Sequence, residues 1–137
     1  MTVEREIGPD EQAVRAAIEV YEDAVHTANP ESFARVFHPD AKVVRPLVPG
    51  GPLIELPLTS YQGAAEVLYD GAVPVHETTR NVTVDVSGHV AVAHLDFSVT
   101  VGDEVFEGTD FINLAKLQGR WLVTYVLWDT WPVAGER

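Results

Sequence analysis

The spacing of apolar residues changes along the chain, from helical in the first third to strand-like in the second half. Asp10 is a suitable N-cap, and the apolar residues after it recur every three or four positions on one stripe: Val14, Ala17, Ile18, Tyr21 and Val25. Asn29-Pro30-Glu31 is a second start signal, a cap residue followed by proline at the first helical position. We therefore predict two successive helices, the second with an apolar face of Phe33, Val36 and Phe37.

The stretch ARVFHPDAKVVRP marks the change from helix to strand. His38 suits the end of the second helix, Pro39 cannot continue that helix, and Asp40 favours a turn before the extended run Ala41 to Leu47. This structural role explains His38 and Asp40 better than a catalytic pairing does. Arg45 differs because it lies inside the strand, where its side chain can point inward.

The segment Pro46 to Pro57 holds four prolines and two glycines, which predicts a loop with at most a short edge strand at Leu53 to Leu56. Thr59-Ser60 can cap a third helix that runs through about Tyr69. From Thr78 onward, four segments are rich in β-branched and aromatic residues: TRNVTVDV, HVAVAHLDFSVTV, EVFEGTDFINLAK and RWLVTYVLWDTW. Three turn signals separate them, Ser87-Gly88, Gly102-Asp103 and Gln118-Gly119, and this predicts an antiparallel meander in an α+β domain.

Composition narrows the function classes. A chain of 137 residues fits a single domain, and its net charge of −12 argues against binding to nucleic acid or to an anionic membrane surface. The absence of cysteine excludes disulfides and thiolate metal ligands. No signal peptide is visible and no apolar run approaches the ~20 residues of a membrane span, so we expect a cytoplasmic protein. No histidine motif with metal-ligand spacing occurs, so we predict neither a metal nor another cofactor.

Two longer stretches, YEDAVHTANPESFARVFHPDAKVV and GTDFINLAKLQGRWLVTYVLW, resemble the nuclear transport factor 2-like superfamily. This cone fold is shared by ketosteroid isomerase, scytalone dehydratase and SnoaL-like polyketide cyclases, and the second stretch looks most like the "putative lumazine-binding" group. The resemblance covers essentially residues 1–137. It implies three N-terminal helices packed on a strongly curved, mostly antiparallel sheet that encloses a pocket. Its motif residues are mainly structural, so function must be argued from the pocket.

The resemblance to ketosteroid isomerase extends to only one of three catalytic roles. The oxyanion-hole tyrosine corresponds to Tyr21, which is retained, but the general-base aspartate falls on Arg45. The second oxyanion-hole carboxyl group falls on Phe111 if no gap is allowed. Steroid isomerisation by that mechanism is therefore not expected. Tyr21 itself has two interpretations, a ligand-facing donor or a core tyrosine bonded to a backbone carbonyl or water.

For three further candidate residues, the sequence does not decide which face of the sheet the side chain occupies. His94 shares a strand face with Asp96; the register of ketosteroid isomerase turns that face inward, whereas hydrophobicity favours Ala91, Ala93, Leu95 and Phe97 inward. Asp110 and Phe111 are adjacent and therefore point to opposite faces, and either of them can be the one that faces inward. Trp128 suits either a cavity wall or a dimer contact. His26 and His76 lie near element ends, where exposure is expected.

These observations predict a cofactor-independent enzyme of the cyclase, dehydratase or isomerase type that acts on a hydrophobic metabolite. Its catalytic candidates are Tyr21, His94 and Asp110, and its ligand-binding candidates are Arg45, Phe37, Phe111 and Trp128. The alternatives are a non-catalytic binder of a small heteroaromatic or polyketide-like ligand, and an interaction module with no ligand. Apolar residues on both strand faces exceed what one core can bury, which predicts a homodimer through the sheet.

Overall fold

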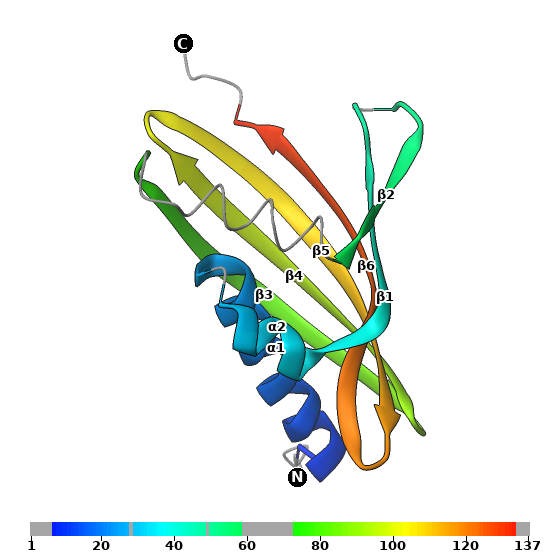
Figure 1. The fold of residues 1–137 in the computed structure, drawn as a ribbon. Helices are drawn as coiled ribbons and strands as arrows, with labels where there is room; N and C mark the ends of the chain where they lie inside the picture. Colours follow the sequence, from blue (N-terminus) through cyan, green and yellow to red (C-terminus); the bar gives the residue numbers. More distant parts are fainter. Residues whose placement is uncertain (1–6, 28, 49, 59–72, 134–137) are drawn as a thin grey trace, which may run out of the picture.

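Two helices precede six strands in the computed structural model, which describes residues 7–27, 29–48, 50–58 and 73–133 (Figure 1). The elements are α1 (Pro9–Thr27), α2 (Pro30–Val36), β1 (Phe37–Pro46), β2 (Leu53–Pro57), β3 (Val75–Ser87), β4 (Val90–Val101), β5 (Glu104–Leu117) and β6 (Arg120–Pro132). The predicted third helix, from Thr59-Ser60 to about Tyr69, lies outside the described residues.

The strands form one mixed sheet in the order β2-β1-β6-β5-β4-β3. Strands β3 to β6 make the predicted antiparallel meander, and β2 is the predicted short edge strand, antiparallel to β1. The contact between β1 and β6 is parallel, so the last strand lies inside the sheet rather than at its edge. Figure 1 shows α1 and α2 together on one face of the sheet, which confirms the α+β prediction. We call this face helix-facing and the opposite one outer.

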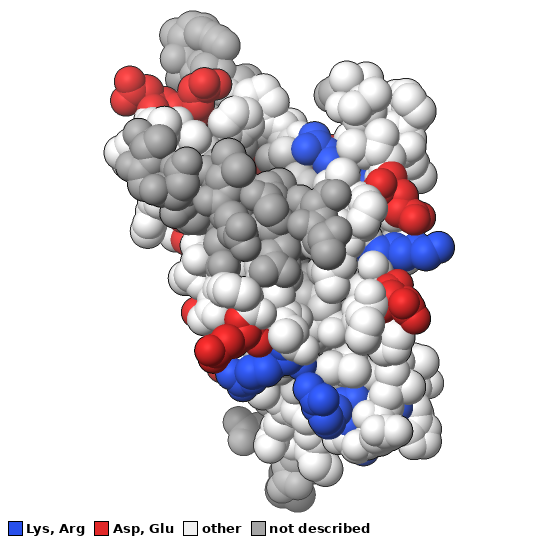
Figure 2. Space-filling model, in the orientation of Figure 1, with Lys and Arg blue, Asp and Glu red and all other residues white. Residues whose placement is uncertain are grey.

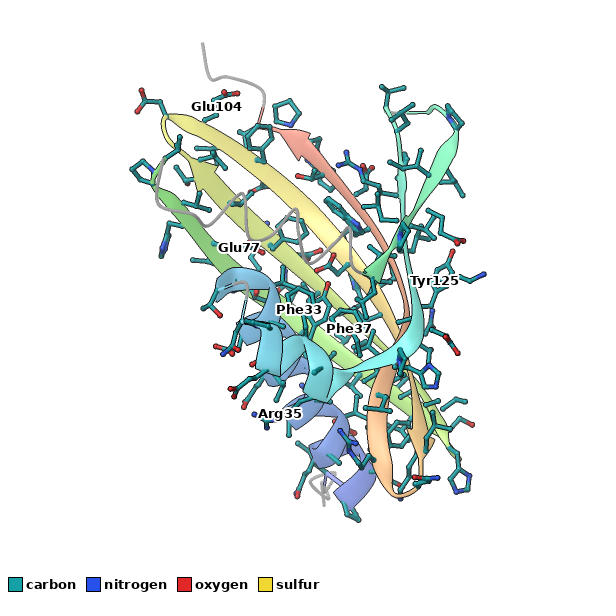
Figure 3. All side chains as sticks on the ribbon, in the orientation of Figure 1. Phe33, Arg35, Phe37, Glu77, Glu104 and Tyr125 are labelled. Atoms are coloured by element: carbon teal, nitrogen blue, oxygen red, sulfur yellow. The ribbon has the colours of Figure 1, made fainter. Side chains whose placement is uncertain are left out.

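The core lies between the helices and the helix-facing side of the sheet. The stripe of α1 is buried there through Val14, Ile18 and Tyr21, as predicted. Phe37 lies with its ring centroid 5.7 Å from that of Tyr21, and it stacks on Phe33 at 5.4 Å (Figure 3). From the sheet, alternate strand residues complete the core, among them Ala93, Leu95, Ile112, Leu114, Val123 and Val126.

The boundary between α2 and β1 differs slightly from the prediction. Asn29 caps α2 as expected, because its side-chain oxygen accepts the backbone N–H groups of Glu31 and Ser32. The helix then ends at Val36, so His38 belongs to β1 and not to the helix end. Its Nδ1 accepts the backbone N–H of Asp40 at 3.0 Å, which is a local structural bond.

Two irregularities change which side chains face the helices. Strand β3 carries one extra residue between Arg80 and Thr83, where Asn81 has a φ of 57°, and β6 carries one at Thr124. An extra residue reverses the alternation of faces on the rest of the strand. As a result, Glu77 and Thr79 share the helix-facing side with Val84, and Trp128 shares it with Trp121. Strict alternation would place Trp121 and Trp128 on opposite faces.

A glycine in β5 is required by close packing. A Cβ atom at the buried Gly108 would clash with the ring of Phe97 and lie 2.6 Å from the backbone carbonyl oxygen of Asp129. We expect Gly108→Ala to lower the free energy of unfolding by about 1–3 kcal/mol, because the backbone cannot yield as a flexible side chain would. Gly8→Ala is the control, since a Cβ there meets nothing within 4 Å. Urea unfolding of both variants tests this; equal stabilities would contradict it.

Candidate functional site

A buried carboxyl group lies at the centre of the helix-facing side of the sheet. Asp110 of β5 is 8% exposed, and its neighbours across the strands are Leu95 on β4 and Trp128 on β6. The hydroxyl of Tyr21, from α1, hydrogen-bonds this carboxyl group. The open choice between Asp110 and Phe111 is therefore resolved geometrically: Asp110 points toward α1, and Phe111 is 42% exposed on the outer face.

The surroundings of Asp110 favour its neutral form. Burial is the main cause, and the negative charges of Glu77 and Glu22 add to it, whereas His26 and the Tyr21 hydroxyl act in the opposite direction. The sum raises the pKa of Asp110 from an ordinary 3.8 to about 7. A carboxyl group with such a pKa can both donate and accept a proton near neutrality.

A histidine and a glutamate form an ion pair beside this group. His26 Nε2, from the last turn of α1, lies 2.9 Å from Glu77 Oε2 on β3, and their side chains are 24% and 12% exposed. Burial of the imidazole opposes its charging, but the hydrogen bond and charge of Glu77, together with Glu22 and Asp110, raise the pKa of His26. Burial likewise raises the pKa of Glu22. His26 is therefore partly buried and paired, and not the freely exposed residue that the sequence predicted.

An arginine lies over an aromatic ring at the β1–β6 contact. The guanidinium carbon of Arg45 is 4.6 Å from the centroid of the Trp128 ring, a cation–π geometry. Arg45 also donates through Nε to the carbonyl oxygen of Pro46 at 3.1 Å. Both side chains are half-buried, and Trp128 packs against the core. An indole therefore lies on β6, the strand next to that of Asp110, and a planar cation from β1 lies over it.

The second histidine candidate lies on the other side of the sheet. His94 points to the outer face, as hydrophobicity favoured, where its Nε2 is 2.8 Å from Thr109 Oγ1 and 3.4 Å from Asp96 Oδ1. Its ring stacks on Phe111, with centroids 4.6 Å apart. Because the sheet separates these residues from Tyr21 and Asp110, His94 and Phe111 cannot contact a ligand bound beside that pair.

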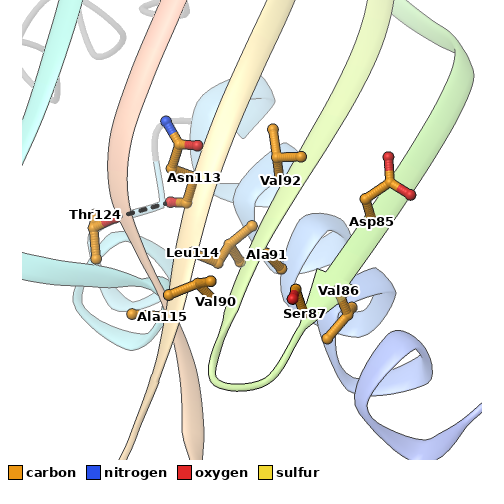
Figure 4. A pocket seen from close by; sticks show the side chains of 10 residues that line it. All are labelled: Asp85, Val86, Ser87, Val90, Ala91, Val92, Asn113, Leu114, Ala115 and Thr124. Carbon is orange, nitrogen blue, oxygen red and sulfur yellow. Dashed lines mark hydrogen bonds between the residues drawn. The ribbon is translucent and has the colours of Figure 1, made fainter.

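The outer face also carries exposed apolar residues: Val90, Val92, Val105, Phe111, Leu127 and Trp131. An open groove of about 550 Å³ crosses β3, β4 and β5 near two hairpin turns, and Val90, Val92 and Asn113 project into it (Figure 4). In the view of Figure 4, the helices lie behind the sheet.

Charged side chains of both signs line one edge of the sheet (Figure 2). Figure 2 shows acidic and basic side chains alternating along the edge formed by β1 and β2, where Lys42 Nζ lies 3.8 Å from Glu55 Oε2. Among the described residues, no group of three or more acidic or histidine side chains is arranged to hold a metal ion. The two described helices include none that is long and apolar enough to cross a membrane.

Sequence reasoning did not identify Glu22 or Glu77 as site residues, and it assigned His26 to an exposed position with no role in the site. Glu22 and His26 have the four-residue spacing that places two side chains on one side of a helix, so that signal was present. Glu77 gave no usable signal, because its orientation depends on the extra residue in β3.

Comparisons with known proteins agree with this architecture. Residues 9–129 match a family model described as "Putative lumazine-binding", and the chain belongs to that family. No curated protein gives a significant match. The solved structures similar to this chain establish a nuclear transport factor 2-like fold.

Three of these structures show the levels of identity and coverage that the matches reach. A protein of unknown function from Shewanella baltica is 22% identical, covers 95% of this chain and 100% of its own, and has a TM-score of 0.69. A "Putative Scytalone Dehydratase" from Novosphingobium aromaticivorans is 16% identical, with coverages of 89% and 84% and a TM-score of 0.69. LinA is 16% identical, with coverages of 92% and 93% and a TM-score of 0.66. At these identities the likeness concerns the fold alone.

The raised pKa of Asp110 predicts that stability falls as pH rises. The unfolded chain releases this proton near 3.8 and the folded chain near 7, so the folded state holds one more proton between these values. The free energy of unfolding should therefore decrease across that window, by at most on the order of 4 kcal/mol. Asp110→Asn, which cannot ionise, should remove this decrease. Urea unfolding across the window measures both slopes, and parallel slopes would contradict the prediction.

Proposed function

We propose that the protein binds a small, largely apolar molecule beside Tyr21 and Asp110 and carries out cofactor-independent acid–base chemistry on it, of the isomerase, dehydratase or cyclase type. The observation that supports this most is the buried Asp110 carboxyl group, which is hydrogen-bonded to Tyr21 and has a pKa of about 7. Strongly shifted carboxyl groups with a specific partner are typical of functional sites. A purely structural core position would instead be filled by an apolar side chain.

The chemistry follows from the two groups. When a ligand is bound, the Tyr21 hydroxyl donates a hydrogen bond to a ligand carbonyl oxygen and stabilises the negative charge that develops there. Asp110 in its ionised form removes a proton from the carbon beside that carbonyl group. It then returns the proton to another carbon, which completes an isomerisation, or to a leaving hydroxyl group, which departs as water. In the isomerisation the electron pair of the broken C–H bond stays on the substrate, and in the dehydration the C–O pair leaves with the water molecule, so neither route needs an oxidant or reductant.

Arg45 and Trp128 give this site a means of orienting its ligand. The indole offers a flat surface to a planar ring system, and the guanidinium above it can bind an anionic or carbonyl group of the same ligand. The preferred substrate is therefore a planar, apolar molecule with at least one carbonyl group.

A non-catalytic binding function is the second candidate. The pair of Arg45 and Trp128 suits a heteroaromatic ligand without any proton transfer, and the family description names lumazine, a flat heteroaromatic dione. In this alternative Tyr21 and Asp110 recognise a ligand carbonyl group and do not react with it.

We further propose that two copies of the chain pair through the outer face of the sheet. The exposed Phe111 and Leu127, which lie opposite each other on β5 and β6, support this, because exposed apolar side chains that lie together often mark a protein contact. A two-fold contact would also cover the groove in Figure 4.

The catalytic proposal predicts that Tyr21→Phe lowers turnover by roughly a hundred- to thousandfold, the usual effect of removing one positioned donor. Proton NMR in deuterated water follows exchange beside the carbonyl group in a panel of enolisable cyclic ketones and hydroxyketones. Tyr125→Phe is the matched control, since this tyrosine lies on the outer face near β1 (Figure 3). Thermal unfolding of both variants checks that the fold is kept.

The outcomes separate the candidates. Exchange that Tyr21→Phe removes and Tyr125→Phe leaves intact supports the enzyme. Quenching of tryptophan fluorescence by lumazine, with no exchange in any ketone, supports the binding protein. Exchange at the full wild-type rate in Tyr21→Phe, or neither exchange nor binding, overturns the proposal.

The assembly proposal predicts a particle of about 30 kDa by light scattering at micromolar concentration, twice the 15.0 kDa mass of one chain. Phe111→Asp should give the monomer, because it places a charge in the proposed contact. Leu53→Asp is the control: Leu53 is also exposed and apolar, but it lies on the edge strand β2. A wild-type monomer would rule out the dimer.

A further inference from the structure

His26 and Glu77 approach Asp110 from two different elements. His26 lies in the last turn of α1 and Glu77 near the start of β3, and their 2.9 Å contact joins the helix to the sheet. Both side chains keep part of their surface exposed to solvent. The pair therefore lies close to the buried carboxyl group and also in contact with solvent.

We propose that His26 and Glu77 form a second acid–base pair of the site, in which His26 releases a proton to solvent and takes it up again in step with the protonation of Asp110. The inference rests on the proposed function in one respect, because the pair takes part in a reaction only if Asp110 carries the substrate proton. In that role His26 and Glu77 are positioning residues, which act through Asp110.

The charges around Asp110 give the pair this influence. Tyr21, Glu22 and His26 face it from α1 and Glu77 faces it from β3, while Arg45 of β1 lies over the neighbouring Trp128. Among the described residues, three carboxyl groups and one imidazole share this part-buried space, so their full ionisation leaves excess negative charge. A proton retained by one of these four groups relieves that repulsion. Whether Asp110 holds this proton depends on whether His26 is charged.

The coupling between the charges of Asp110 and His26 gives a balanced proton cycle. When a substrate C–H bond breaks, its electron pair stays on the substrate as an enolate and its proton goes to the Asp110 carboxylate. Loss of the negative charge at Asp110 weakens the hold of His26 on its own proton, which passes to water. When Asp110 protonates the product, its negative charge returns and His26 takes up a proton again. No net charge accumulates over one cycle.

The two members of the pair should move the titration of Asp110 in opposite directions. His26→Gln removes a positive charge that lowers the pKa of Asp110, so that pKa should rise. Glu77→Gln removes a negative charge that raises it, so the pKa should fall, and the pKa of His26 should fall with it. Carbon-13 NMR of labelled aspartate and nitrogen-15 NMR of histidine measure these values in the full chain without any ligand.

Matched controls come from the same sheet. His76→Gln changes an exposed histidine next to Glu77 on the opposite side of β3, and Glu107→Gln changes an outer-face glutamate paired with Arg80. Neither should move the titration of Asp110. If the pKa of Asp110 is unchanged in both test variants, the proposed coupling is overturned. A fall of this pKa in both variants also overturns it, because loosened packing that admits water would lower the pKa whichever partner is changed.

Failure of this inference is distinct from failure of the proposed function. Opposite shifts without turnover of any ketone would retain the coupled pair and remove the catalytic proposal. Turnover that depends on Tyr21, with no change in the pKa of Asp110 in either variant, would retain the catalytic proposal and remove the coupled pair. With a substrate in hand, activity that requires ionised Asp110 should begin at higher pH in His26→Gln and at lower pH in Glu77→Gln.

Discussion

The position of one extra residue in each of two strands decides what the helix-facing side of this sheet contains. Side chains alternate between the two faces of a strand, and an inserted residue reverses that alternation beyond it. In β3 the reversal brings Glu77 to the face that holds Asp110, and in β6 it does the same for Trp128. Without these bulges the same sequence would direct both side chains to the outer face, and residues such as Arg80 would replace Glu77 on the helix-facing side of β3.

Helix α1 has two roles that depend on each other. Val14 and Ile18 anchor it to the sheet, and this anchoring holds Tyr21 against Asp110 and His26 against Glu77. The apolar stripe therefore sets the distances within the polar cluster. Burial by the same packing raises the pKa of Asp110, so the group that we propose to carry protons also makes the fold less stable at higher pH. Stability and the proposed chemistry are linked through one carboxyl group.

The two faces of the sheet differ in composition. The helix-facing side combines an apolar core with a few converging polar groups, a combination typical of small-molecule sites. The outer face combines exposed apolar side chains with the hydrogen-bonded set of His94, Asp96 and Thr109. A shared family and fold do not distinguish between catalysis and binding, because function on this scaffold depends on the side chains at the site.

The sequence by itself determined most of the architecture. Helical spacing, the Asn29 cap, the turn glycines and the β-branched segments act locally, so they identified α1, α2, the edge strand and the antiparallel meander. They also identified Tyr21, Arg45, Asp110 and Trp128 as candidates. Local signals could not determine strand register, since hydrophobicity and the resemblance to ketosteroid isomerase favoured opposite faces for His94. Only the tertiary structure decided that Asp110 faces inward and His94 outward, because the helices, which are distant in the chain, cover one face of the sheet. It also paired His26 with Glu77, and that contact depends on the bulge in β3.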